Sequence, residues 1–122
     1  MDKISRIGPP EAIGFSDGFY SFVIRLNEPP AGHWIYAFKM ATPVAPEVDP
    51  ERVVVDPQRG LLFESDEGHA ISWVNHIDLW ITSANKQVAE DEAAEEKRRA
   101  EVQARGQREL LLQQMNEKLK HL

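Results

Sequence analysis

The chain has 122 residues and no cysteine, and its 20 acidic and 14 basic side chains give a net charge of −6. The absence of cysteine excludes disulfides, thiolate nucleophiles and zinc sites built on sulfur, which fits a reducing cytoplasm. The first ten residues lack the apolar stretch of a secretory signal, and no apolar run of about 18 residues occurs, so we expect a cytoplasmic protein that does not cross a membrane.

The helix-breaking and aromatic residues are unevenly distributed. All prolines, all aromatic rings and all glycines but Gly106 precede residue 81. We therefore expect an irregular N-terminal arm (1–18), an α+β core domain (19–88) and a charged helical C-terminal extension (89–122). Residues 1–88 hold 7 basic and 12 acidic side chains. Since phosphate backbones need clustered Lys and Arg, we expect no nucleic-acid binding.

The first regular element that the sequence predicts is a strand. In the arm, Gly8, Pro9 and Pro10 are typical of irregular chain. From Phe19 to Leu26, every second residue is strongly apolar, which is the period of a strand with one buried face. Pro29 and Pro30 follow and cannot extend a hydrogen-bonded ladder, so the strand ends before them.

The segment from Ala31 to Ala41 fits two structures. As a helix, it gathers Trp34, Ile35, Ala37, Phe38 and Ala41 within an arc of about 160°. As a strand, it places Trp34, Tyr36, Phe38 and Met40 on one face. We prefer the helix, because prolines directly before a segment favour a helix start.

A hairpin is predicted next. Two apolar runs, Arg52–Val55 and Leu61–Glu64, flank the sequence Asp-Pro-Gln-Arg-Gly at 56–60. Asp suits the first position of a type I turn, Pro fixes φ at the second, and Gly60 can adopt the positive φ that the following bulge requires. The two runs should therefore form antiparallel strands.

A long amphipathic helix begins near Ala70. On a helix of 3.6 residues per turn, eight apolar side chains fall within an arc of about 120°. They are Ala70, Trp73, Val74, Ile77, Trp80, Ile81, Ala84 and Val88. The sequence thus predicts an α+β fold in β-α-β-β-α order, with a small antiparallel sheet and a long C-terminal helix that extends beyond the core.

The extension, residues 89–122, keeps high helix propensity but loses the large apolar side chains. Glu95 and Glu101 each precede an arginine by four residues, a spacing that stabilises an exposed helix. We expect a bend or break at Gly106. Beyond it, Leu111, Leu112, Met115 and Leu119 recur at helical spacing. These four residues are our candidate partner-binding site, for a protein partner or for a second copy of the chain.

Polar residues with metal-binding or catalytic chemistry are few. Glu67 and His69 could hold a weakly bound ion together with His33 or Asp56, but His69 and His76 lie about 10 Å apart along the helix axis, too far to share one metal. The sequence also lacks a nucleophile elbow, a phosphate loop and a dinucleotide fingerprint. We therefore assign no catalytic, metal-binding or cofactor-binding residue and expect no cofactor.

No motif is specific for one biochemical activity, so the sequence leaves two hypotheses. The first is a non-enzymatic interaction or adaptor protein that uses its C-terminal helix. The alternative is a small enzyme or ligand-binding domain with a cleft between sheet and helix, in which His69, His76, Asp66 and Glu67 would act.

Overall fold

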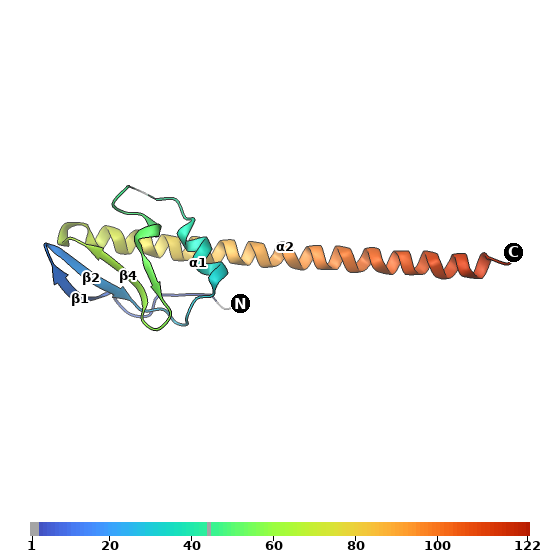
Figure 1. The fold of residues 1–122 in the computed structure, drawn as a ribbon, viewed down its shortest axis with the longest axis horizontal. Helices are drawn as coiled ribbons and strands as arrows, with labels where there is room; N and C mark the ends of the chain where they lie inside the picture. The colour runs from blue at the N-terminus through green and yellow to red at the C-terminus, as the bar shows by residue number, and fades with distance from the viewer. Residues whose placement is uncertain (1–2, 44) are drawn as a thin grey trace. The chain divides into compact units, whose positions relative to one another are not determined.

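The computed structural model describes residues 3–43 and 45–122, so Met1 and Asp2 of the expected arm and Val44 of the expected core domain lie outside the described residues. The chain divides into two compact units, Met1–Val88 and Ala89–Leu122. The first unit contains every strand, the short helix and the beginning of the long helix (Figure 1).

The fold is α+β, with a four-stranded antiparallel sheet in the order β1-β2-β4-β3 and a long C-terminal helix. The elements in chain order are β1 (Glu11–Ser16), β2 (Phe19–Ile24), α1 (Gly32–Lys39), β3 (Val54–Asp56), β4 (Gly60–Ser65) and α2 (Ala70–Leu119). Two short 3-10 helices, Pro50–Arg52 and Glu67–His69, precede β3 and α2. The helix that we preferred for residues 31–41 is confirmed as α1.

Strand β1 corrects the expected irregular arm. It pairs with β2 through a two-residue turn at Asp17 and Gly18, whose φ angles of 52° and 82° are both positive, as a type I′ turn requires. All six residues of β1 are exposed, and the register shifts between Ala12 and Gly14. An exposed, bulged edge strand has no apolar alternation, which is why the arm appeared irregular in sequence. The element order is therefore β-β-α-β-β-α.

The predicted hairpin of β3 and β4 is confirmed. Asp56 accepts hydrogen bonds from the backbone N–H groups of Gln58 (2.8 Å) and Arg59 (3.2 Å), which fixes the turn. Gly60 has a φ of +115°, and a Cβ atom there would lie 2.2 Å from the carbonyl oxygen of Ile24. Only glycine fits this position, because β2 passes too close for any side chain.

The core lies between one face of the sheet, α1 and the first part of α2. Aromatic rings connect these layers: Phe63 of β4 stacks on Trp73 at 5.5 Å between ring centroids, and Trp80 meets both Trp73 (6.2 Å) and Phe38 of α1 (6.0 Å) edge to face. The predicted apolar stripe of α2 accounts for the buried residues of that helix, which are Trp73, Ile77, Trp80, Ile81, Ala84 and Val88. The core therefore belongs to the first unit.

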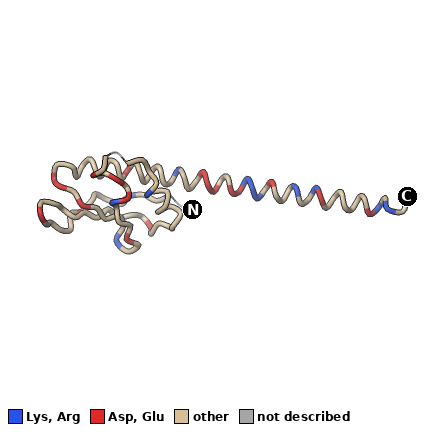
Figure 2. The backbone as a smooth tube through the Cα atoms, turned by 45° about the horizontal axis from the view of Figure 1, so that its top comes forward, with Lys and Arg blue, Asp and Glu red and all other residues tan. Residues whose placement is uncertain are grey.

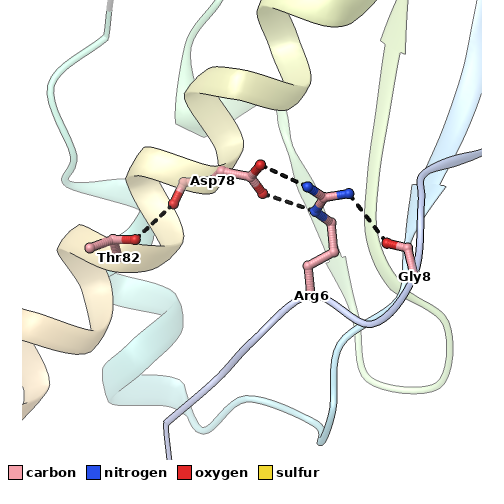
Figure 3. Close-up of polar contacts among 4 residues, drawn as sticks. All are labelled: Arg6, Gly8, Asp78 and Thr82. Atoms are coloured by element: carbon pink, nitrogen blue, oxygen red, sulfur yellow. Dashed lines mark hydrogen bonds and ion pairs between the residues drawn. The ribbon is translucent and has the colours of Figure 1, made fainter.

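The residues before β1 are also ordered, because α2 binds them in two places. Arg6 donates two parallel hydrogen bonds to the carboxylate of Asp78, at 3.0 and 2.9 Å, and a third to the carbonyl oxygen of Gly8 (Figure 3). About two turns further on, the Asn85 side chain accepts from Ile4 N and donates to Ile4 O, and Ile4 is 2% exposed. This N-terminal segment is thus part of the core rather than an arm.

The expected break at Gly106 does not occur, since α2 runs without interruption from Ala70 to Leu119. Gly106 has no side-chain or backbone neighbour that a Cβ atom would meet. The helical propensity of the surrounding residues outweighs the cost of about 1 kcal/mol for one exposed glycine.

Candidate interaction surfaces

The first candidate surface is the C-terminal leucine face, which consists of Leu111, Leu112, Met115 and Leu119. On α2 these side chains fall within an arc of about 100°. Each is between 49% and 65% exposed, so the predicted partner-binding residues are available on one face of the second unit. Leu110 is 53% exposed, as is Met115, but it points about 150° away from the centre of this face.

Charged residues of both signs are mixed along the rest of the second unit (Figure 2). Its 8 acidic and 7 basic side chains nearly cancel. Glu95 pairs with Arg98 at 2.6 Å and with Arg99 at 3.4 Å, and the hydrogen bond from Arg98 lowers the pKa of the Glu95 carboxyl group. The second expected pair, Glu101 with Arg105, forms no ion pair in the described part of the chain. Helix propensity and local ion pairs therefore sustain this segment.

The second candidate surface is a groove in the first unit, with a volume of about 1170 Å³. Its walls come from all four strands, the loop before β3 and the start of α2. The lining is mainly apolar, with some polar and charged side chains. The lining includes Glu47, Val48, Arg52, Val54, Leu62, Phe63, Glu64, Ser65, Asp66, His69 and Trp73.

Two of the residues predicted for a His/carboxylate cleft meet at this groove. Asp66 accepts hydrogen bonds from the ring Nδ1 of His69 at 2.7 Å and from the backbone N–H of His69 at 2.9 Å. The bond from the His69 side chain is the main cause that lowers the pKa of the Asp66 carboxyl group. Asp66 thereby caps the turn that leads into α2. The contact between Asp66 and His69 therefore has a structural role as a helix cap. Both side chains also line the groove.

The other residues of that set are not brought to the groove. His76 places Nδ1 2.7 Å from the carbonyl oxygen of Ser72 one turn earlier, so this ring nitrogen donates to the helix backbone. Glu67 is exposed and does not line the groove. Among residues 3–43 and 45–122, no three His, Asp or Glu side chains gather closely enough to hold a metal ion.

The sequence suggested a cleft between sheet and helix only as an alternative, and it gave no direct indication of the edge of β4 beside the groove. Strand β3 pairs with β4 only as far as Leu62, where its partner is Val54, whereas β2 pairs with β4 to Ser65. The signal in the sequence was the group of three prolines before the first run of the hairpin, Pro43, Pro46 and Pro50, which cannot extend a hydrogen-bonded ladder.

Comparisons with models of protein families, with curated proteins and with solved structures found no match to this chain. Within the described residues, neither α1 nor α2 contains the long apolar stretch that a membrane-crossing helix needs. The function must therefore be argued from the surfaces themselves.

Proposed function

We propose that this protein is a cytoplasmic, non-enzymatic interaction protein that associates through the C-terminal leucine face. The observation that supports the proposal is the exposure of four large apolar side chains that cluster on one face of a helix, in a segment whose other exposed residues are mainly polar or charged. Apolar side chains clustered in this way are normally covered by another protein surface.

The partner to which we commit is a second copy of the chain. The second unit carries 8 acidic and 7 basic side chains, so two copies of it meet with little net repulsion. Burying four half-exposed side chains from each copy contributes on the order of 10 kcal/mol, against an association cost of about 4–15 kcal/mol. We therefore expect a reversible dimer that forms with rising concentration, rather than a permanent one.

A matched pair of substitutions tests this proposal. Met115→Glu places a carboxylate at the centre of the leucine face, whereas Leu110→Glu makes the same change at an equally exposed position on another face. Molar mass measured by light scattering over a concentration series gives the dissociation constant of each variant. We expect Met115→Glu to weaken the dimer by at least about tenfold, because each copy then buries a charge.

The control should behave differently. Leu110→Glu is expected to change the dissociation constant by less than about threefold. Equal effects of the two substitutions would contradict a role for the leucine face. If the wild-type chain stays monomeric but binds another protein, the partner of the leucine face is that protein and the proposed dimer is wrong.

A second function, ligand binding in a cleft, is supported by one observation. The groove brings Asp66 and His69 together beside a mainly apolar wall, and ligand-binding sites commonly combine an apolar lining with a few polar groups. Asp66 is engaged in capping the turn before α2. The groove therefore supports ligand binding rather than acid–base catalysis. If the NMR chemical shifts of Asp66, His69 and Trp73 do not move on titration with a set of small polar and apolar molecules, this second function is excluded.

A further inference from the structure

The edge of β4 has an unpaired stretch in the described part of the molecule. Its residues 63–65 form a ladder with β2 on one side, while the ladder with β3 on the other side ends at the Val54–Leu62 pair. The chain before Val54 turns away as a 3-10 helix, with Arg52 N–H donating to Asp49 O at 2.9 Å. A strand edge of three residues, about 10 Å long, is therefore left without a neighbouring strand.

The groove lies along this same edge. It is lined by Phe63, Glu64 and Ser65 of the unpaired stretch and by Val54, where β3 begins. Its volume of about 1170 Å³ exceeds that of most small-molecule pockets, which hold about 300–1,000 Å³, and suits a short stretch of polypeptide. The free edge and the cavity are two independent observations that coincide at one place.

The two sides of the groove differ in chemistry. Successive residues of β4 face opposite sides of the sheet, so Phe63 points to the core and Glu64 points to the other face. On the core side the groove is walled by Val48 and Trp73. On the other side lie Leu62 and the exposed carboxylate of Glu64.

The charge at the groove is mainly negative. Three carboxylates, Glu47, Glu64 and Asp66, line it, against Arg52 and His69. The Arg52 guanidinium already donates to the backbone oxygen of Glu47, at 3.4 Å. A ligand with cationic side chains therefore fits the groove better than an anionic one.

From these observations we infer that the groove binds an extended peptide, which adds a strand to the free edge of β4. Side chains of an extended peptide alternate between two sides. Apolar side chains at every second position would contact Val48 and Trp73, and Lys or Arg at the positions between them would lie beside Glu64. Strand addition of this kind takes its affinity from main-chain hydrogen bonds and its selectivity from the alternating side chains.

Three labelled heptapeptides, used with the full-length protein, test the inference by fluorescence anisotropy. The first alternates valine and lysine, the second alternates valine and glutamate, and the third is the valine–lysine peptide with N-methylated backbone amides at alternate residues. We expect the valine–lysine peptide to bind at least about tenfold more tightly than either of the others. Equal binding of the glutamate peptide would overturn the charge argument, and equal binding of the methylated peptide would overturn strand addition.

Two charge reversals locate the site. Glu64→Lys changes the groove, whereas Glu67→Lys makes the same change at an exposed position outside it. We expect Glu64→Lys to weaken the valine–lysine peptide by about three- to tenfold and Glu67→Lys to have less than a twofold effect. Equal effects would refute a site at the groove.

Amide hydrogen exchange reports where the peptide lies. Alternate amides of residues 63–65 already face β2, so added protection should appear at the amides that face the free edge when the valine–lysine peptide is added. Protection at Glu11–Ser16 instead would place the peptide on the outer edge of β1 and overturn the inference. The inference is also overturned if the amides that face the free edge are already protected in a dimer without peptide, because the groove would then hold a second copy.

Discussion

Replacing Asn85 by alanine should strongly destabilise the first unit, although Asn85 lies on a helix and is only partly buried. Its side chain takes part in three hydrogen bonds: Oδ1 accepts from Ile4 N at 3.1 Å and from Trp34 Nε1 at 2.9 Å, and Nδ2 donates to Ile4 O at 2.7 Å. One side chain thus connects α2 to α1 and to the N-terminal segment.

The size of the effect follows from these bonds. Each contributes about 1 kcal/mol net, so their loss should cost about 3 kcal/mol of unfolding free energy. Alanine regains up to about 0.7 kcal/mol through its higher helix propensity. Asn75→Ala, at an exposed position on the same helix, makes the same propensity gain and serves as the matched control.

Urea unfolding followed by tryptophan fluorescence measures the difference, because Trp34, Trp73 and Trp80 all lie in the first unit. We expect Asn85→Ala to be about 3 kcal/mol less stable than Asn75→Ala, which corresponds to a drop in melting temperature on the order of 15 °C. A difference below about 1 kcal/mol would refute the role assigned to Asn85.

Three further predictions concern the turns and the helix. Gly60→Ala should cost at least about 2 kcal/mol in the same titration, since its φ is +115° and the new Cβ would meet Ile24 O; a loss below about 1 kcal/mol would contradict this. Gly106→Ala should instead stabilise α2 by about 1 kcal/mol, seen as a higher helical signal in circular dichroism, and a lower signal would show that the glycine is needed. The pKa of Asp66 is lowered by the His69 side chain, so its stabilising effect is present above about pH 4 and is lost as the pH falls through the folded-state pKa. The Asp66→Asn variant should therefore lose less unfolding free energy than the wild type between pH 7 and pH 3. Equal losses would show that protonation of Asp66 does not affect stability.

Patterns with a strong local cause were predictable from the sequence. The stripe of α2 was visible because large apolar residues repeat at helical spacing from Trp73 to Val88. The β3–β4 hairpin was visible because its turn needs Asp56 and Gly60 at fixed positions. In both cases one local requirement selects the residue types.

The missed features depend on contacts between distant segments. Strand β1 has no buried face, and its one local signal was the Asp17-Gly18 pair, which is typical of a two-residue hairpin turn. The lining of the groove could not be predicted, because Val48, Glu64 and Trp73 come from three segments that only the fold brings together. The C-terminal leucine face was predicted as a pattern, since exposed residues of a helix need no tertiary contact to be placed.

The central claim is that the last turns of α2 hold the chain in a dimer. The most direct measurement is the molar mass in solution of the full-length protein, compared with a chain that ends at Arg105 and so lacks the leucine face. We predict that the full-length mass rises above the 13.9 kDa of one chain as concentration increases. The shortened chain should remain monomeric with unchanged tryptophan fluorescence. A full-length protein that stays at one chain throughout, or a shortened chain that dimerises equally well, would contradict the account.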